Sequence, residues 1–307
     1  MDYSIETNDL NFSFAQNRKV VDELNLRVPQ GSIYGFLGPN GAGKTTTIRL
    51  LTGMLANERD NIFIQGKSLQ KFSPSIFKSI GCLIETPSLY LHLTGKENLR
   101  LITTLRSSDT GRIENILATV GLADAANRKV KEYSLGMKQR LGIGMALLPD
   151  PELLILDEPV NGLDPNGIIE IRELLIRLNK QEGKTVFISS HLLHEIEKSC
   201  THIGIINRGA LRYEGTLEAM KNTAYASGEV VFKISEADQW IEPLQSRFQM
   251  ARRHAQDEII FPFKAQDDVV QINQQLVEMQ VPVAGIHIRG GLEEWFMQII
   301  SNDKQTV

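Results

Sequence analysis

Eight residues near the N-terminus constrain this chain more than any other stretch. Residues 38–45 read Gly-Pro-Asn-Gly-Ala-Gly-Lys-Thr and match the phosphate-binding pattern G-x-x-x-x-G-K-[ST] at every fixed position. The apolar run 33–37 precedes the loop as a buried strand would, and residues 45–51 follow it with the pattern of a helix. Strand, glycine-rich loop and helix in this order predict an α/β fold of the P-loop NTPase type.

The chemistry of phosphate binding explains these residue types. Glycines allow backbone N–H groups to turn toward an anion, and the positive end of the following helix reinforces that site. We expect Lys44 to contact the β- and γ-phosphates and the Thr45 hydroxyl to bind Mg²⁺. The expected phosphate-binding residues are Gly38, Pro39, Asn40, Gly41, Ala42, Gly43, Lys44, Thr45 and Thr46. The loop alone does not say which NTPase this is.

A second anchor follows a four-residue aliphatic run at 153–156, where Asp157, Glu158 and Pro159 come next. A carboxylate at the end of a buried strand can hold Mg²⁺ through water, and we assign that role to Asp157. Glu158 would polarise a water for attack on the γ-phosphate. The alternative is an acidic strand end that opens a turn at Pro159, and the phosphate loop disfavours it.

The strand and helix pattern extends this α/β reading over residues 1–222. Short buried strands at 153–156, 185–188 and 202–206 alternate with helical segments, which predicts a mainly parallel core sheet covered on both faces. Residues 88–149 are helical in pattern and interrupt the strands, so we expect an inserted helical subdomain. The alternation at Leu10–Phe14 indicates a small antiparallel β subdomain at the start of the chain.

A second domain is expected over residues 226–307, after small and polar residues cluster at 222–228. Its pattern indicates a small α/β accessory domain of independent size. The expected strands are 229–234, 258–263 and 281–288, and the expected helices are 236–245, 267–279 and 291–300. This domain carries no phosphate loop. Support of a dimer, regulation and mere packing all remain open as its role.

Composition excludes several classes of protein and indicates where in the cell this chain would work. A net charge of −4 over 307 residues argues against a dedicated nucleic-acid binder. Cys82 and Cys200 are the two cysteines, and they provide neither a disulfide framework nor zinc spacing. The N-terminus lacks a signal-peptide pattern, and no window approaches the length of a membrane helix. We therefore expect a cytoplasmic protein whose membrane role would depend on a partner.

Three further segments make the chain resemble the ABC ATPase family. Residues 134–140, Ser-Leu-Gly-Met-Lys-Gln-Arg, are similar to the S-G-G-Q signature, with Leu135 and Met137 departing from it. Residues 161–165, Asn-Gly-Leu-Asp-Pro, resemble the D-loop, and Ser189-Ser190-His191 resembles the switch-histidine segment. Phe14 falls where the family has an aromatic that stacks on adenine; core packing is the alternative for this side chain.

The resemblance implies an ATP-hydrolysing enzyme that requires Mg²⁺ and works in pairs. In this family, two ATPase domains sandwich two nucleotides head to tail. Ser134 and Gly136 would then contact the γ-phosphate held by the partner's Lys44, and His191 would contact the γ-phosphate of its own site. Asp164 would lie at the dimer interface. The resemblance leaves homodimer and heterodimer open, and it implies a separate transmembrane permease that would hold the chain at the cytoplasmic face of the cell membrane.

One departure from the family pattern points to a branch. The family has glutamine after the strand at 80–84, whereas this chain has Glu85. A carboxylate there would tighten metal binding and repel phosphate, so we expect Glu85 to act in catalysis and as a metal ligand beside Thr45 and Asp157. Together with residues 133–139 and the C-terminal segment 291–296, Glu85 makes the chain similar to the bacitracin-resistance and lantibiotic-immunity exporters.

The resemblance to these exporters implies that ATP hydrolysis is coupled to export of an antimicrobial peptide or antibiotic. A soluble ABC ATPase that acts on ribosomes or DNA is the alternative, but such proteins usually carry tandem ATPase domains, a long coiled-coil insertion or basic patches. A GTPase or small-molecule kinase is disfavoured because no guanine-reading N-K-x-D motif is present. Residues 179–182, Asn-Lys-Gln-Glu, are a near miss at an expected helix end.

Overall fold

A computed structural model describes residues 2–14, 18–106, 110–225, 228–263, 266–289 and 292–301. The chain divides into two compact units, residues 1–215 and 216–307. The division falls before the helix at 217–225, somewhat earlier than the boundary expected from composition. Residue 226, where the second domain was expected to begin, and Gly291, where its last helix was expected to begin, lie outside the described residues.

A six-stranded sheet forms the centre of the first unit, in the order β12-β11-β5-β10-β9-β8. Its strands are β5 (Ile33–Leu37), β8 (Ile80–Leu83), β9 (Leu153–Leu156), β10 (Thr185–Ser190), β11 (His202–Asn207) and β12 (Ala210–Thr216). The pairings from β8 through β9, β10 and β5 to β11 are parallel. Every residue of β5, β9 and β10 is buried, as expected for strands covered on both faces. The predicted parallel α/β core is confirmed.

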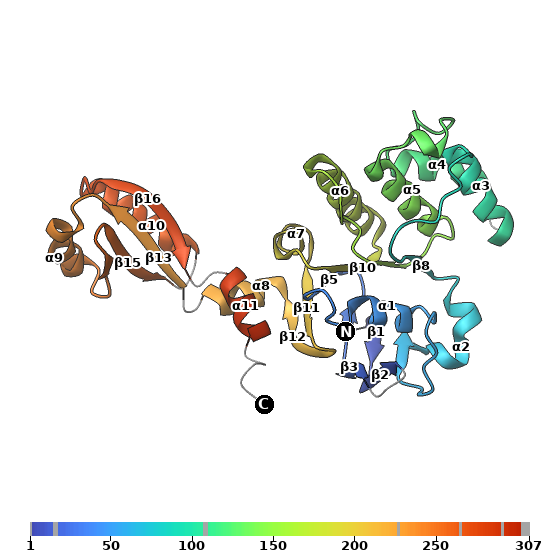
Figure 1. The fold of residues 1–307 in the computed structure, drawn as a ribbon, viewed down its shortest axis with the longest axis horizontal. Coiled ribbons are helices and arrows are strands. Elements are labelled where there is room, and N and C mark those ends of the chain that lie inside the picture. The colour runs from blue at the N-terminus through green and yellow to red at the C-terminus, as the bar shows by residue number, and fades with distance from the viewer. Residues whose placement is uncertain are drawn as a thin grey trace. The chain divides into compact units, whose positions relative to one another are not determined.

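Helices cover the two faces of this sheet. On one side lie α6 (Pro165–Glu182) and α7 (Leu193–Ser199), and on the other lies α1 (Lys44–Leu51) (Figure 1). The predicted helical subdomain contains α3 (Gly95–Arg106), α4 (Ile113–Thr119) and α5 (Leu135–Leu147), with two short 3₁₀ turns at Thr110–Arg112 and Val130–Glu132. Of these, α5 packs on the edge strand β8.

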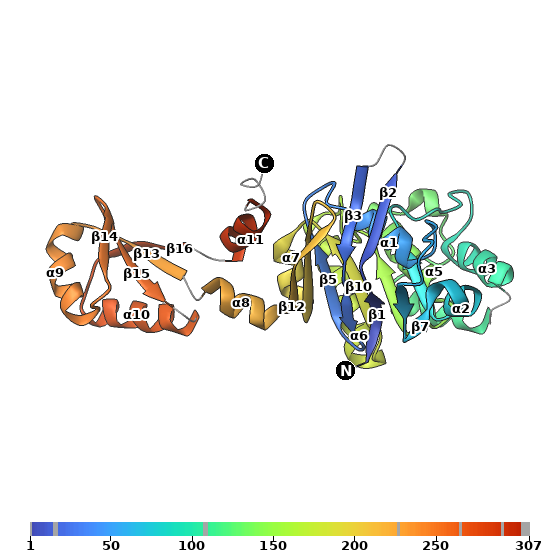
Figure 2. The same ribbon diagram turned by 90° about the horizontal axis from the view of Figure 1, so that it is seen from below.

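An antiparallel layer lies beside α1, as the alternation at the start of the chain predicts (Figure 2). One sheet has the order β4-β1-β6-β7, and β2 pairs with β3 in a separate hairpin. The strands are β1 (Tyr3–Thr7), β2 (Leu10–Phe14), β3 (Arg18–Leu24), β4 (Arg27–Pro29), β6 (Ile62–Ile64) and β7 (Lys67–Ser68). The sequence pattern did not predict β6, β7 or the following helix α2 (Leu69–Ile76).

The helix α6 shows how local chemistry sets an element's limits. Asp164 is its N-cap and accepts a hydrogen bond from the Gly167 N–H at 3.0 Å, while Pro165 occupies the first helical turn. Gly183 ends the helix in the left-handed conformation that favours glycine. Asp164 therefore stabilises the start of α6 within its own chain, independently of any role at a dimer interface.

The second unit contains a βαββαβ arrangement of the ferredoxin-like type. Its sheet has the order β14-β15-β13-β16. The strands are β13 (Gly228–Ile234), β14 (Arg252–Ala255), β15 (Glu258–Phe263) and β16 (Val283–Arg289), and the helices are α8 (Leu217–Tyr225), α9 (Ala237–Arg247), α10 (Gln266–Glu278) and α11 (Leu292–Ser301). An apolar core includes alternate residues of β13 and β15 with residues of α9 and α10. The strand predicted from Val281 begins two residues later, after Pro282, which cannot donate a ladder hydrogen bond.

Among the described residues, no helix is both long and apolar enough to cross a membrane. The longest uninterrupted apolar stretch of the sequence, residues 141–148, lies at the end of α5. This helix has 13 residues and is mostly buried inside the first unit.

A charged contact joins the helical subdomain to the central sheet. Asp150, between α5 and β9, lies 3.1 Å from the Arg112 guanidinium and 2.8 Å from the Lys184 ammonium. Lys184 is buried and also donates to the Pro151 carbonyl. Hydrogen bonds from Arg112 and then from Lys184 lower the pKa of the Asp150 carboxyl from 3.8 to about 2.

We predict that Asp150→Asn lowers the free energy of unfolding by about 1 kcal/mol at pH 7, since the half-exposed carboxylate is partly screened by solvent. A depressed pKa stabilises the fold above the ordinary value and loses that effect as pH falls through the folded value. The difference from wild type should therefore narrow below about pH 4 and vanish near pH 2. Urea unfolding across this range measures it, with the exposed Asp124→Asn as control. A pH-independent difference would contradict the assignment.

Candidate functional site

The glycine-rich loop between β5 and α1 packs directly against neighbouring backbone. A Cβ on Gly38 would lie 2.3 Å from the Ile206 carbonyl oxygen, and one on Gly43 would lie 2.7 Å from the Val20 carbonyl oxygen. Gly43 also has a φ of 110°, a conformation that favours glycine. Both positions therefore require glycine for steric reasons, and the loop is held close to the sheet.

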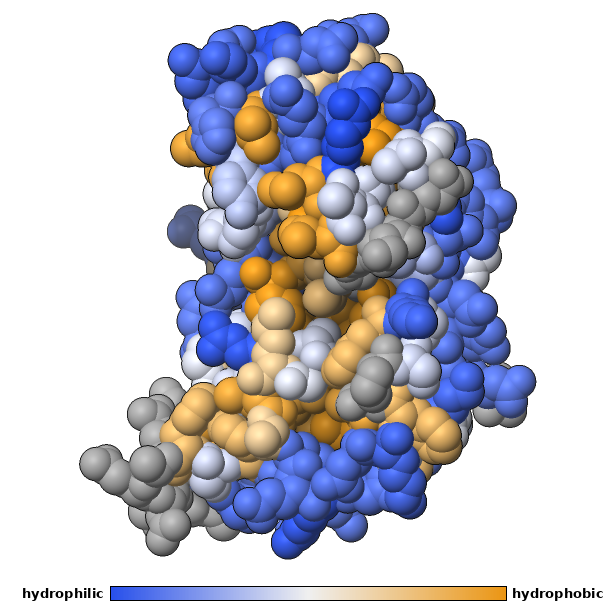
Figure 3. All heavy atoms as spheres, turned by 90° about the vertical axis from the view of Figure 1, so that its right-hand side faces the viewer, coloured by the Kyte–Doolittle hydropathy of each residue, from blue (hydrophilic) through white to orange (hydrophobic). Residues whose placement is uncertain are grey.

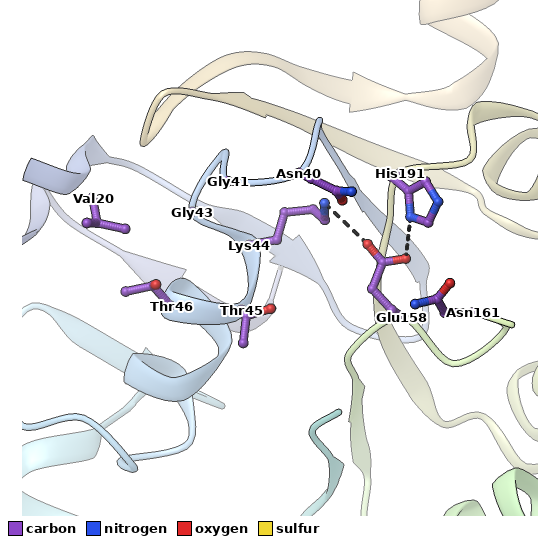
Figure 4. A pocket seen from close by; sticks show the side chains of 10 residues that line it. All are labelled: Val20, Asn40, Gly41, Gly43, Lys44, Thr45, Thr46, Glu158, Asn161 and His191. Carbon is purple, nitrogen blue, oxygen red and sulfur yellow. Dashed lines mark hydrogen bonds and ion pairs between the residues drawn. The ribbon is translucent and has the colours of Figure 1, made fainter. Parts of the chain in front are cut away.

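A pocket of ≈ 350 Å³ opens over this loop (Figure 4). Its lining combines the loop, the start of α1 and the ends of β9 and β10. The lining residues are Val20, Asn40, Gly41, Gly43, Lys44, Thr45, Thr46, Glu158, Asn161 and His191. Gly38 and Pro39 contribute carbonyl oxygens to Lys44, whereas Ala42 is buried in the core. Six of the nine expected phosphate-binding residues thus line one pocket.

Glu158 lies between two other side chains of this pocket. Its Oε1 is 3.2 Å from the Lys44 Nζ, and its Oε2 is 2.9 Å from the His191 Nδ1, as Figure 4 shows. The Lys44 ammonium is largely buried and donates to the Gly38 carbonyl at 2.8 Å. A buried cation aimed into a loop of backbone N–H groups suits a phosphate, and the neighbouring carboxylate is placed to accept a proton from water.

Beneath them, Thr45 and Asp157 meet at the end of the sheet. The Thr45 hydroxyl donates to Asp157 Oδ2 at 2.8 Å, and Asp157 is buried. These two hard oxygen donors fit Mg²⁺, which typically takes one or two protein ligands and completes its shell with water and phosphate oxygens. A cluster of three or more histidine, cysteine or acidic side chains able to hold a metal does not occur in the described part of the chain.

Ser189 is a site residue that sequence reasoning did not single out. Its hydroxyl donates to Asp157 Oδ1 and accepts from the Glu158 backbone N–H at 2.9 Å, while its side chain is buried. It therefore orients both acidic residues at once. The available signal was its position: Ser189 lies near the carboxyl end of β10, and parallel strands bring such ends to the same edge of a sheet.

Besides Gly38, Pro39, Ala42 and Asp157, which pack directly around it, four further expected site residues do not line this pocket. Phe14, on β2, is half exposed and packs edge-on against Phe12 with ring centroids 5.0 Å apart. Glu85 forms an ion pair with Arg49 on the outer part of α1.

The other two lie in the helical subdomain at the start of α5. Ser134 is the N-cap of α5 and accepts from the Met137 N–H at 3.2 Å. Gly136, in the first turn of that helix, lies near Gly167 in α6. This segment is therefore held against α6 and away from the pocket of its own chain.

Comparison with known proteins gives consistent matches. A family model described as ABC transporter matches residues 21–161. The bacitracin transport ATP-binding protein BcrA of Bacillus licheniformis is 40% identical over 301 residues, covering 96% of this chain and 97% of BcrA. The lantibiotic transport ATP-binding protein SrtF of Streptococcus pyogenes is 42% identical over 205 residues, covering 67% of this chain and 88% of SrtF.

The solved structures agree on the fold. One described as the ATP-binding subunit of an ABC transporter superposes with a TM-score of 0.63 at 30% identity and covers 71% of this chain and 92% of its own. The match spans about the length of the first unit.

We predict that Ser189→Ala slows hydrolysis of the nucleoside triphosphate by about tenfold, since it removes one hydrogen bond from each acidic residue and leaves the partly buried Glu158 N–H without its acceptor. Nucleotide affinity should change much less, because Ser189 does not line the pocket. Steady-state phosphate release and equilibrium nucleotide binding separate the two effects. Ser190→Ala is the matched control, since within the described part of the chain the Ser190 hydroxyl accepts only from the Leu192 N–H. Equal activity in Ser189→Ala and wild type would contradict the positioning role.

Proposed function

Because the chain belongs to the ABC transporter family of ATP-binding subunits, we propose that it powers export of an antimicrobial peptide or antibiotic through a separate permease. The chain is an ATP-binding and ATP-hydrolysing subunit of an ABC transporter, and members of this family dimerise and work with permease subunits. The observation that carries the proposal is the match to a bacitracin transport protein along nearly the whole of both chains. A soluble ABC ATPase acting on ribosomes or DNA is not favoured.

The pocket supports specific roles in ATP hydrolysis. Lys44 would bind the β- and γ-phosphates together with backbone N–H groups of the glycine-rich loop, and the Thr45 hydroxyl and the Asp157 carboxylate would hold Mg²⁺. A γ-phosphate oxygen would replace Glu158 as the partner of Lys44, and the freed carboxylate would then accept a proton from the attacking water. His191 contacts the γ-phosphate, and Ser189 keeps Asp157 and Glu158 in place.

Residues outside the pocket receive roles that depend on a second subunit or on adenine. We assign Ser134 and Gly136 to the γ-phosphate of the facing subunit, in a homodimer or heterodimer, because they lie at the exposed start of α5. Phe14 remains the candidate for stacking on adenine, and its exposed ring is compatible with that role. Residues 1–222 form the nucleotide-binding domain in this proposal, and the accessory domain from 226 supports the dimer or regulates it.

One face of the first unit is suited to bind the permease. Apolar side chains gather in a band across the face that carries α2 and α3 (Figure 3). We call the exposed large apolar residues of the segment between the end of α1 and the end of α3 the docking surface: Met54, Phe72, Tyr90, Leu91 and Leu105. A hollow of ≈ 230 Å³ lies nearby between the end of α1 and α2. Exposed apolar patches of this kind mark interaction sites, and a bound permease would hold the protein at the cytoplasmic face of the membrane.

We predict that Glu158→Gln retains ATP binding and lowers ATP turnover by about 10²-fold or more, the scale of removing a general base. The amide keeps the shape of the side chain but cannot accept the proton from water. ATP should then trap the dimer, which size-exclusion chromatography with and without ATP detects. Wild-type turnover in the purified variant would remove Glu158 from the role of base.

We predict that Leu91→Glu prevents the chain from copurifying with its permease, because burying a carboxylate in an apolar contact is costly. The tagged chain would be purified from detergent-solubilised native membranes, and the copurifying proteins identified. Val277→Glu is the matched control, as it places the same charge at an exposed apolar position of the accessory domain. Wild-type protein recovered only with ribosomes or DNA would overturn the transport proposal.

A further inference from the structure

The ion pair between Arg49 and Glu85 lies at the same edge of the sheet as the Mg²⁺ ligands. The strands β8 and β9 run parallel with Leu83 beside Leu156, and the Asp157 N–H donates to the Leu83 carbonyl at 2.9 Å. Glu85 comes two residues after the end of β8, and Asp157 directly follows the end of β9. Glu85 is also one of the non-glycine residues with a left-handed backbone, with a φ of 61°, and this turn leads its side chain to Arg49.

Arg49 reaches this edge from the phosphate-binding helix. It lies four residues after Thr45 in α1, which places the two side chains on the same helix face about 6 Å apart along the axis. The Arg49–Glu85 pair is thus one helical turn from the contact between Thr45 and Asp157. A charge at this distance is felt by a bound metal ion and by the triphosphate.

The balance of charge at this edge depends on which acids are already paired. Glu158 contacts Lys44 and His191, while Asp157 accepts from two hydroxyl groups. Glu85 adds a further negative charge where the family has a neutral glutamine. Without a cation beside it, this charge would attract the metal and repel the triphosphate, and Arg49 is the cation that the structure places against it.

We propose that Arg49 is a positioning residue for Glu85: it holds the carboxylate one helical turn from the contact between Thr45 and Asp157 and balances its charge, so that a glutamate can serve where the family uses glutamine. This inference rests on the proposed role of Glu85 near the metal. Both side chains are considerably exposed, with 37% and 59% of their surfaces accessible. Exposed ion pairs are weak, so Arg49 can release Glu85 toward the metal at little cost.

Three variants of the full chain test the proposal by binding alone: Arg49→Gln, Glu85→Gln and the double variant. The probes are the non-hydrolysable analogue AMP-PNP, measured with and without divalent metal, and Mn²⁺, followed by electron paramagnetic resonance in the presence of AMP-PNP. Arg247→Gln is the matched control, because Arg247 faces Glu278 in an exposed ion pair of the accessory domain.

The two single variants should shift binding in opposite directions. Arg49→Gln leaves an unbalanced carboxylate, so Mn²⁺ should bind more tightly and metal-free AMP-PNP more weakly, each by roughly fivefold, the upper range for exposed charges. Glu85→Gln leaves an unbalanced guanidinium and should do the reverse. The double variant should return close to wild type, and the control should not differ from it.

Several results would overturn the proposal. Losses in the same direction for both single variants, or a loss that persists in the double variant, would make the pair a structural contact. A shift in Glu85→Gln without one in Arg49→Gln would reject the role of Arg49 while keeping Glu85 near the metal. No shift in Glu85→Gln would reject both, whereas the role of the chain as a transport ATPase is tested separately by its copurification with a permease.

Discussion

Direct packing of the phosphate loop between strands β11 and β3 is the constraint on which the site depends. Gly38 touches the backbone of β11 and Gly43 touches that of β3, with no space for a side chain at either position. Because the loop is held from both sides, Lys44 and Thr45 enter α1 at a defined place above the strand ends. Asp157 and His191 arrive there from β9 and β10. Backbone contact at two glycines therefore places groups that are more than 100 residues apart in the chain.

The main strands and helices could be predicted because the burial of each element produces a recognisable pattern of apolar residues. Strands covered on both faces read as aliphatic runs, and β5, β9 and β10 were recognised on that basis. The strands β6 and β7 have three and two residues, too few for a pattern, and α2 contains a non-helical residue, Phe72. The segment of β14 reads Arg-Arg-His-Ala and is mostly exposed; it is a strand because β15 supplies hydrogen bonds, a tertiary effect that composition does not reveal.

The same distinction applies to the site. A single site could be predicted from the sequence for Lys44, Asp157, Glu158 and His191, because the carboxyl ends of parallel strands lie at one edge of the sheet. Ser189 required the actual hydrogen bonds, since a serine near a strand end has no pattern of its own. The family pattern also led us to expect Glu85 near the metal. It did not predict that Glu85 pairs with Arg49, because Arg49 lies 36 residues earlier in the chain, in helix α1.

The cap on α6 has a consequence for the way two subunits meet. Asp164 uses its carboxylate to bind the Gly167 N–H, so the loop from Asn161 to Asp164 is already ordered in the single chain. Association costs conformational entropy when loops must be ordered at an interface, and a loop ordered beforehand avoids most of that cost. If this loop faces the partner, the subunits meet as preformed surfaces, and the nucleotide between them rather than loop folding decides when they close.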